Sequence, residues 1–186
     1  MGGILTVVEV SAKEYALERK QYCTVFDLPE FAQLNSVKCE RIHYLFFNDS
    51  KKNLGLILGA KAKELLMPFS APHAFFSWIK TNPKLSDFSG AVQALDAFGK
   101  DAGYSGITIT LPPFLYHEDN LTKALNSFVQ NGYSIDKVDL NQHLAMEDFS
   151  VSYLECIDSK ARQKNKAGLS YGLIFYISEG AQHLDT

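Results

Sequence analysis

The sequence predicts a mixed α/β fold, in which a largely antiparallel central sheet is flanked by helices on both faces. Two observations support this fold class. Apolar residues make up 46% of the 186 residues and Gly and Pro number only 12 and 6, so the chain can bury a substantial core. The hydrophobic period changes along the chain in the order β-α-α-β-β-β-α-β-α-β-β. Three successive strands, followed by a helix that leads to a further strand, produce a mixed sheet with helices on its two faces.

The first part of the chain predicts one strand and two helices. Residues 4–10 are rich in β-branched side chains, which favour a strand. Ser11 and Glu14 have the spacing of a capping box, so we expect a helix to begin directly after that strand. Asp27 as N-cap and Pro29 in the first turn predict a second, short helix.

A meander of three strands follows, over residues 42–47, 54–59 and 64–69. The polar residues between the first two strands are typical of a hairpin turn. We expect the third strand to end near Pro68, because proline cannot donate a hydrogen bond to a neighbouring strand.

The second half of the chain alternates helices and strands. Ser86 is expected to cap a helix that ends at Gly103, because apolar side chains recur at helical spacing between them. The alternation in residues 106–111 predicts a strand, and residues 119–130 predict another helix. Residues 134–149 predict two weaker strands.

Charge, cysteines and hydropathy bound the partners and the compartment. The chain has 18 basic and 21 acidic residues, a formal charge of -3, so DNA is not an expected partner. Its three cysteines form no C-x-x-C pair, which favours a reducing, cytoplasmic location. No apolar run approaches the roughly 20 residues of a membrane span, and no Cys or His cluster has metal-ligand spacing. We therefore expect no membrane span and no metal.

Several stretches together resemble a known family. They are Pro68-Phe69-Ser70-Ala71-Pro72, the helix over residues 88–102 with Gly103, Ile107 to Pro113 with Tyr116 three residues later, Gly132-Tyr133 and Asp139-Leu140-Asn141. Over residues 42–149 they are similar to the first, N-terminal module of the FemAB-like branch of the GNAT acyltransferase superfamily, whose members carry two modules in tandem. We accordingly expect residues 1–149 to form one GNAT-like module. Residues 150–186, a basic helix plus a strand, are similar to the start of a second module.

The resemblance implies a site at the ends of the fourth and fifth strands. In the GNAT fold these strands splay apart and hold acyl-CoA between them, and its pyrophosphate lies at the start of the next helix. Carried onto this sequence, the cofactor-binding residues would be Met67, Phe69, Ser70 and Ala71. Tyr116 would be the acid, with His73 or Glu64 as the base. The substrate-binding residues would be Phe75, Trp78 and His117.

Two functions are consistent with this sequence, besides a purely structural role in which the apolar loop over residues 70–85 and the C-terminal residues pack on a partner chain. The first is an acyltransferase that moves an acyl or aminoacyl group from a thioester or ester donor to an amine or hydroxyl of a small metabolite or a cell-wall or saccharide precursor. The second is a catalytically degenerate GNAT-like module that binds the acceptor or a partner domain. It is favoured because residues 70–85 contain no glycine where the family has a glycine-rich phosphate loop. A second module, or a second copy docked through the C-terminal residues, is the expected protein partner.

Overall fold

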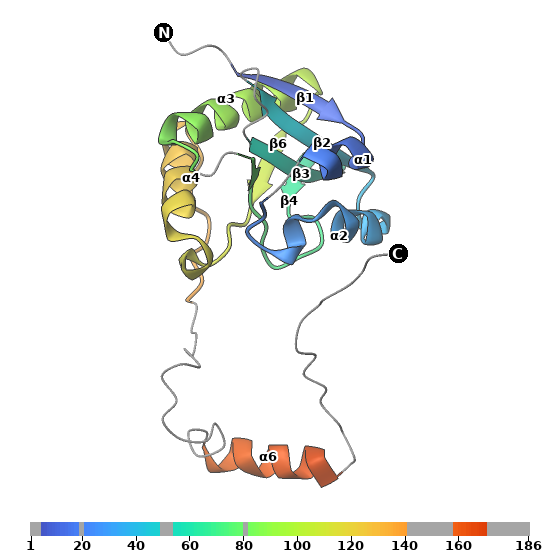
Figure 1. Ribbon diagram of the computed structural model, residues 1–186, viewed down its shortest axis with the longest axis vertical. Coiled ribbons are helices and arrows are strands. Elements are labelled where there is room, and N and C mark those ends of the chain that lie inside the picture. Colours follow the sequence, from blue (N-terminus) through green and yellow to red (C-terminus); the bar gives the residue numbers. More distant parts are fainter. Residues whose placement is uncertain (1–4, 19–20, 49–53, 80–81, 141–157, 171–186) are drawn as a thin grey trace. The chain divides into compact units, whose positions relative to one another are not determined.

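A computed structural model describes residues 5–18, 21–48, 54–79, 82–140 and 158–170. The chain divides into two compact units, Met1–Asp139 and Leu140–Thr186. The first unit is the predicted α/β fold, with a largely antiparallel sheet and helices on both of its faces (Figure 1).

The sheet of the first unit has the strand order β1-β2-β3-β4-β6, and β5 pairs separately with β3. Pairing is antiparallel from β1 to β4, whereas β4 and β6 are parallel. The strands are β1 (Thr6–Val10), β2 (Arg41–Asn48), β3 (Leu54–Lys61), β4 (Glu64–Met67), β5 (Ser77–Trp78) and β6 (Gly106–Ile109). The predicted meander is therefore β2-β3-β4, while β5 lies in a segment for which the sequence predicts no strand.

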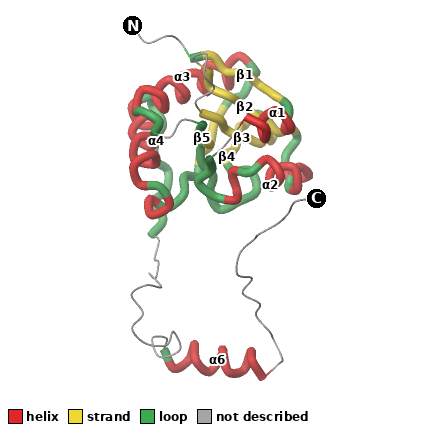
Figure 2. Tube along the Cα trace, viewed as in Figure 1, coloured by secondary structure: helices red, strands yellow, loops and turns green. Residues whose placement is uncertain are grey.

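Helices cover the two faces of the sheet. Figure 2 shows α3 and α4 on one side and α1 and α2 on the other. Their bounds are α1 (Ala12–Glu18), α2 (Pro29–Leu34), α3 (Leu85–Asp101) and α4 (Glu118–Gln130), with short 3-10 turns η1 (Val25–Asp27), η2 (Ser36–Lys38) and η3 (Phe114–Tyr116). The capping box predicted at α1 is confirmed, because Ser11 N donates to Glu14 Oε2 at 2.9 Å and Glu14 N donates to Ser11 Oγ at 3.2 Å.

Two other predicted caps are wrong. Leu28, not Asp27, is the N-cap of α2, because Asp27 is the last residue of η1 and its carboxylate accepts hydrogen bonds from Thr24 instead. Ser86 lies inside α3. The helix begins one residue earlier, after Lys84, whose N–H donates to Asp87 Oδ2 at 2.8 Å.

The end of the first unit departs from the prediction as well. Residues 134–140 form no strand, and Val138 is 84% exposed. The second predicted strand of this stretch lies outside the described residues, as does the strand predicted within residues 173–177. In the second unit the basic residues lie on α6 (Ser159–Ser170). No helix among the described residues is long and apolar enough to cross a membrane.

The two faces of the sheet pack into separate cores. The larger core lies between the sheet and α3 and α4, and its fully buried members include Leu56, Phe76, Phe88 and Leu121. The smaller core, under α1 and α2, contains Tyr15, Ala32, Tyr44, Phe46 and Ile57. The segment after β4 joins the larger core, because Phe75, Phe76 and Trp78 are all at most 3% exposed. Burial of these rings fixes the path of the chain that leaves β4.

Candidate functional site

His73 and Tyr116 lie together beyond the ends of β4 and β6. Their ring centroids are 5.4 Å apart, and Phe26 also packs edge-on against His73, with centroids 5.1 Å apart. They meet because parallel strands end at the same edge of the sheet. Tyr116, in η3, is 51% exposed, so its ring is open to a ligand.

The His73 imidazole has an unsatisfied nitrogen. Nδ1 is buried and has no hydrogen-bond partner among the described residues. Burial lowers the pKa of His73 below its ordinary value, because desolvation disfavours the charged imidazolium. A neutral imidazole can donate or accept one hydrogen bond at such a nitrogen, and a bound molecule would have to uncover Nδ1 to make it.

The predicted substrate-binding residues divide into core and rim. Phe75 is 2% exposed and packs against Phe76, Trp78 and Phe88. Trp78 is 3% exposed and contacts the half-buried His117 edge-on, with centroids 4.9 Å apart. Of the three predicted substrate-binding residues, Phe75 and Trp78 therefore belong to the core, and only His117 lies near the surface.

Glu64 lies at the opposite end of β4. It is exposed and pairs in register with Lys61 and Gly106, whereas the strand ends at Met67. Three residues of strand separate Glu64 from Met67 by about 10 Å. Since His73 and Tyr116 follow the far end of the strands, β4 directs Glu64 away from them.

The predicted splay between the fourth and fifth strands is not present. β4 and β6 are paired from Glu64 with Gly106 to Met67 with Ile109. Beyond this ladder, Thr110 N donates to Met67 O at 2.7 Å, and Ala74 N donates to Thr110 O at 3.1 Å. The two strands are thus paired to the end of β4, and at Ala74 the chain returns to β6 with a further hydrogen bond.

The four residues predicted to bind cofactor are engaged elsewhere. Met67 is 1% exposed, and the Phe69 ring lies against Gly59 so closely that a Cβ at that glycine would collide with it. Ser70 Oγ donates to Asn35 Oδ1 at 2.9 Å, and Ala71 is half-buried. Met67 thus belongs to the larger core, Phe69 packs against β3, and Ser70 is hydrogen-bonded to Asn35 at the end of α2.

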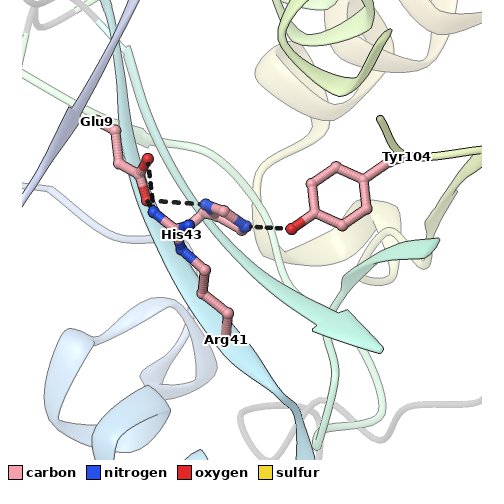
Figure 3. A network of polar contacts seen from close by, with 4 residues as sticks. All are labelled: Glu9, Arg41, His43 and Tyr104. Carbon is pink, nitrogen blue, oxygen red and sulfur yellow. Dashed lines mark hydrogen bonds and ion pairs between the residues drawn. The ribbon is translucent and has the colours of Figure 1, made fainter. Parts of the chain in front are cut away.

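A second polar cluster, which the sequence does not predict, joins Glu9, Arg41, His43 and Tyr104 (Figure 3). Glu9 Oε1 is 2.8 Å from His43 Nδ1, and Tyr104 Oη is 2.7 Å from His43 Nε2. Arg41 contacts the Glu9 carboxylate at 3.0 Å. The sequence contains only a weak sign of this cluster. Because side chains alternate along β2, His43 lies on the same face of the sheet as the buried Leu45.

Among the described residues, no group of three or more His, Cys, Asp or Glu side chains is placed to hold a metal ion. Comparisons of the chain with protein-family models, with curated proteins and with solved structures found no match.

Proposed function

We propose that this chain is a GNAT-like, FemAB-type transferase module that holds an acceptor beside His73 and Tyr116 and does not itself bind acyl-CoA. The hydrogen bond from Ala74 N to Thr110 O carries this proposal, because it extends the pairing of β4 and β6 across the position where the family binds acyl-CoA. A ligand entering between the strands would have to break that bond and separate them.

The start of α3 also fits the CoA pyrophosphate poorly. The Asp87 carboxylate already accepts a hydrogen bond from Lys84 N there, and a second acidic group at the same helix end would be repelled. The absence of glycine from residues 70–85 agrees, because a phosphate approaches backbone amides most closely where side chains are missing.

The rim of the site supports an acceptor. The exposed Tyr116 ring offers a flat apolar surface and contacts His73, whose buried Nδ1 has no hydrogen-bond partner among the described residues and would bind an acceptor once it is uncovered. This pairing suits the amine or hydroxyl of a small metabolite or of a cell-wall or saccharide precursor, the acceptor classes that the family resemblance implies.

The lowered pKa of His73 favours a second candidate function, catalysis of the transfer itself. In that reaction the acceptor amine or hydroxyl attacks the donor carbonyl while the neutral imidazole takes its proton. Tyr116 then protonates the leaving group. The acyl or aminoacyl donor would have to approach from outside the paired strands.

Thermal unfolding with acetyl-CoA tests whether this module binds the donor. A folded-state site filled at 100 times its dissociation constant adds about 2.7 kcal/mol of stability. We expect no shift in Tm at millimolar acetyl-CoA, and a saturable rise would contradict the proposal.

NMR spectra recorded with N-acetylglucosamine or glycyl-lysine as probe test the acceptor site, through the ring signals of His73 and Tyr116. We expect one of these probes to move both sets of signals. Tyr116→Phe is the matched control, because it keeps the ring and removes the hydroxyl. Retained binding with lost transfer in this variant would favour the catalytic candidate, whereas signals unmoved by either probe would remove the acceptor site.

A further inference from the structure

Glu9, His43 and Tyr104 form a continuous chain of hydrogen bonds from the surface into the sheet (Figure 3). The Glu9 side chain is 34% exposed, whereas the His43 side chain is 2% exposed. The three residues come from β1, β2 and the segment between α3 and β6, so they meet only in the folded chain.

The chemistry of the three groups decides which atom donates and which accepts in each hydrogen bond. A carboxylate can only accept hydrogen bonds, so the proton shared with Glu9 belongs to His43 Nδ1. In the neutral imidazole, Nε2 then presents its lone pair, and Tyr104 Oη–H donates to it. Phe98 packs edge-on against the His43 ring with centroids 5.3 Å apart, which holds the ring in this orientation.

This is the arrangement of an activated nucleophile: a hydroxyl within hydrogen-bond reach of a base that a third group orients. We propose that Tyr104 is a modification site, an activated hydroxyl that accepts an acyl group from a thioester or another activated acyl compound. His43 is the general base of this step, and Glu9 is a positioning residue that stabilises the imidazolium. The proposal does not depend on the function proposed for the His73 site.

Tyr104 Oη attacks the carbonyl carbon of the donor, and the phenol proton passes to His43 Nε2. The bond between carbonyl carbon and leaving group breaks, and the leaving group takes the proton from Nε2. The products are an aryl ester on Tyr104 and the free thiol or other protonated leaving group, so no oxidant or reductant is needed.

An open, mainly apolar groove, which Thr6 and Asp101 also line, shares Phe98 with the cluster and offers a surface for the acyl chain of such a donor. It has a volume of about 410 Å³ between β1 and α3, and its lining includes Leu5, Val7, Ala97 and Phe98. Phe98 links the two features, because its ring also contacts His43. Tyr104 itself is half-buried, between the exposed residues Gly103 and Ser105.

Acylation of the full chain by N-acetylimidazole, followed by peptide mass spectrometry, tests the proposal. Two tyrosines serve as internal references: Tyr133, which is also half-buried but donates to Asp96 Oδ1 at 2.6 Å, and the exposed Tyr116. We expect Tyr104 to react faster than both, and faster than Tyr133 by on the order of a hundredfold, the lower end of what general-base assistance provides. Labelling of Tyr104 no faster than that of Tyr133 would overturn the proposal.

Variants separate activation from a purely structural tie. His43→Phe keeps a ring against Phe98 but removes the base, so Tyr104 acylation should fall to the Tyr133 rate while the Tyr116 rate stays constant. Glu9→Gln removes the charge at a partly exposed position and should slow Tyr104 severalfold. Arg41→Gln, at a side chain that is 62% exposed, should change the rate little. If His43→Phe does not fold, Glu9→Gln decides alone, and an unchanged rate in a folded variant refutes activation.

Discussion

Replacement of Asp27 by Ala should destabilise the first unit by about 2–4 kcal/mol, because this buried carboxylate ties η1 to the segment after β4. Asp27 is 3% exposed. Its Oδ2 accepts from Thr24 N at 2.8 Å and from Thr24 Oγ1 at 3.0 Å, and its Oδ1 accepts from Phe75 N.

The magnitude follows from what each donor loses. Phe75 N–H is buried, so without Asp27 it is left unsatisfied, at a cost of about 1–3 kcal/mol. The two Thr24 donors are only partly buried and can turn to water, so each costs roughly 0.5–1 kcal/mol. Removing a buried charge returns part of this sum, because its desolvation is relieved as well.

Urea unfolding monitored by tryptophan fluorescence measures the change. The chain has 1 Trp, and Trp78 is 3% exposed in the same core as Phe75, so its emission reports this unit alone. Asp27→Asn is the matched control: it keeps an acceptor for Phe75 N and should cost about 1–2 kcal/mol. If Asp27→Ala stayed within about 0.5 kcal/mol of the parent, as a surface substitution does, the Asp27 carboxylate would not tie η1 to the segment after β4.

Three further predictions follow from single side chains. Gly59→Ala should cost about 1–3 kcal/mol in urea unfolding, because its Cβ collides with Cβ, Cγ and Cδ1 of Phe69, and Phe69→Ala in the same chain, which removes Cγ and Cδ1, should make the two losses less than additive. Burial raises the pKa of the Cys23 thiol to about 12, so iodoacetamide should alkylate Cys23 slowly in the folded chain and rapidly in urea; equal rates would contradict this burial. Burial lowers the pKa of His73, so as pH falls the unfolded chain binds a proton at His73 before the folded chain does. The contribution of His73 to the free energy of unfolding should therefore be lost as pH falls below about 6.5. NMR titration of the His73 imidazole checks this prediction, and a midpoint at or above the ordinary histidine pKa would contradict it. His73→Phe should remove this part of the pH dependence of stability.

Local periodicity was sufficient for the elements that carry it strongly. The β2-β3-β4 meander and α3 follow from strand and helix spacing alone, and the α1 cap follows from two residues three positions apart. Asp27 shows where such reasoning fails. Its carboxylate is used by Thr24, three residues earlier, and by Phe75, 48 residues later, so the cap expected from the local sequence has a stronger competitor in the fold.

The sequence predicted those parts of the candidate site that depend on the direction of the strands. His73 and Tyr116 meet because they follow the ends of two parallel neighbours, which the element order already indicates. The prediction for Glu64 was wrong because Glu64 begins β4, whereas His73 and Tyr116 follow the other end of the strands. The cluster of Glu9, His43 and Tyr104 was missed because its members lie 34 and 61 residues apart, and a lone histidine in a strand carries no local sign of its partners.

The path of the chain after β4 connects the fold to the choice between the two functions. After leaving β4 the chain returns to pair Ser77 and Trp78 with β3, and this return places Phe76, fully buried, against α3 and α4. Opening the strands for acyl-CoA would break the bond from Ala74 N to Thr110 O and pull on this anchored segment. Exposing one Phe side chain alone costs about 1.5–3 kcal/mol, which would be subtracted from the binding free energy. Binding of acyl-CoA between the strands and the packing of this core therefore oppose each other. A donor that did bind there would have to change the environment of Trp78, so its fluorescence separates the two functions even where binding is too weak to shift Tm.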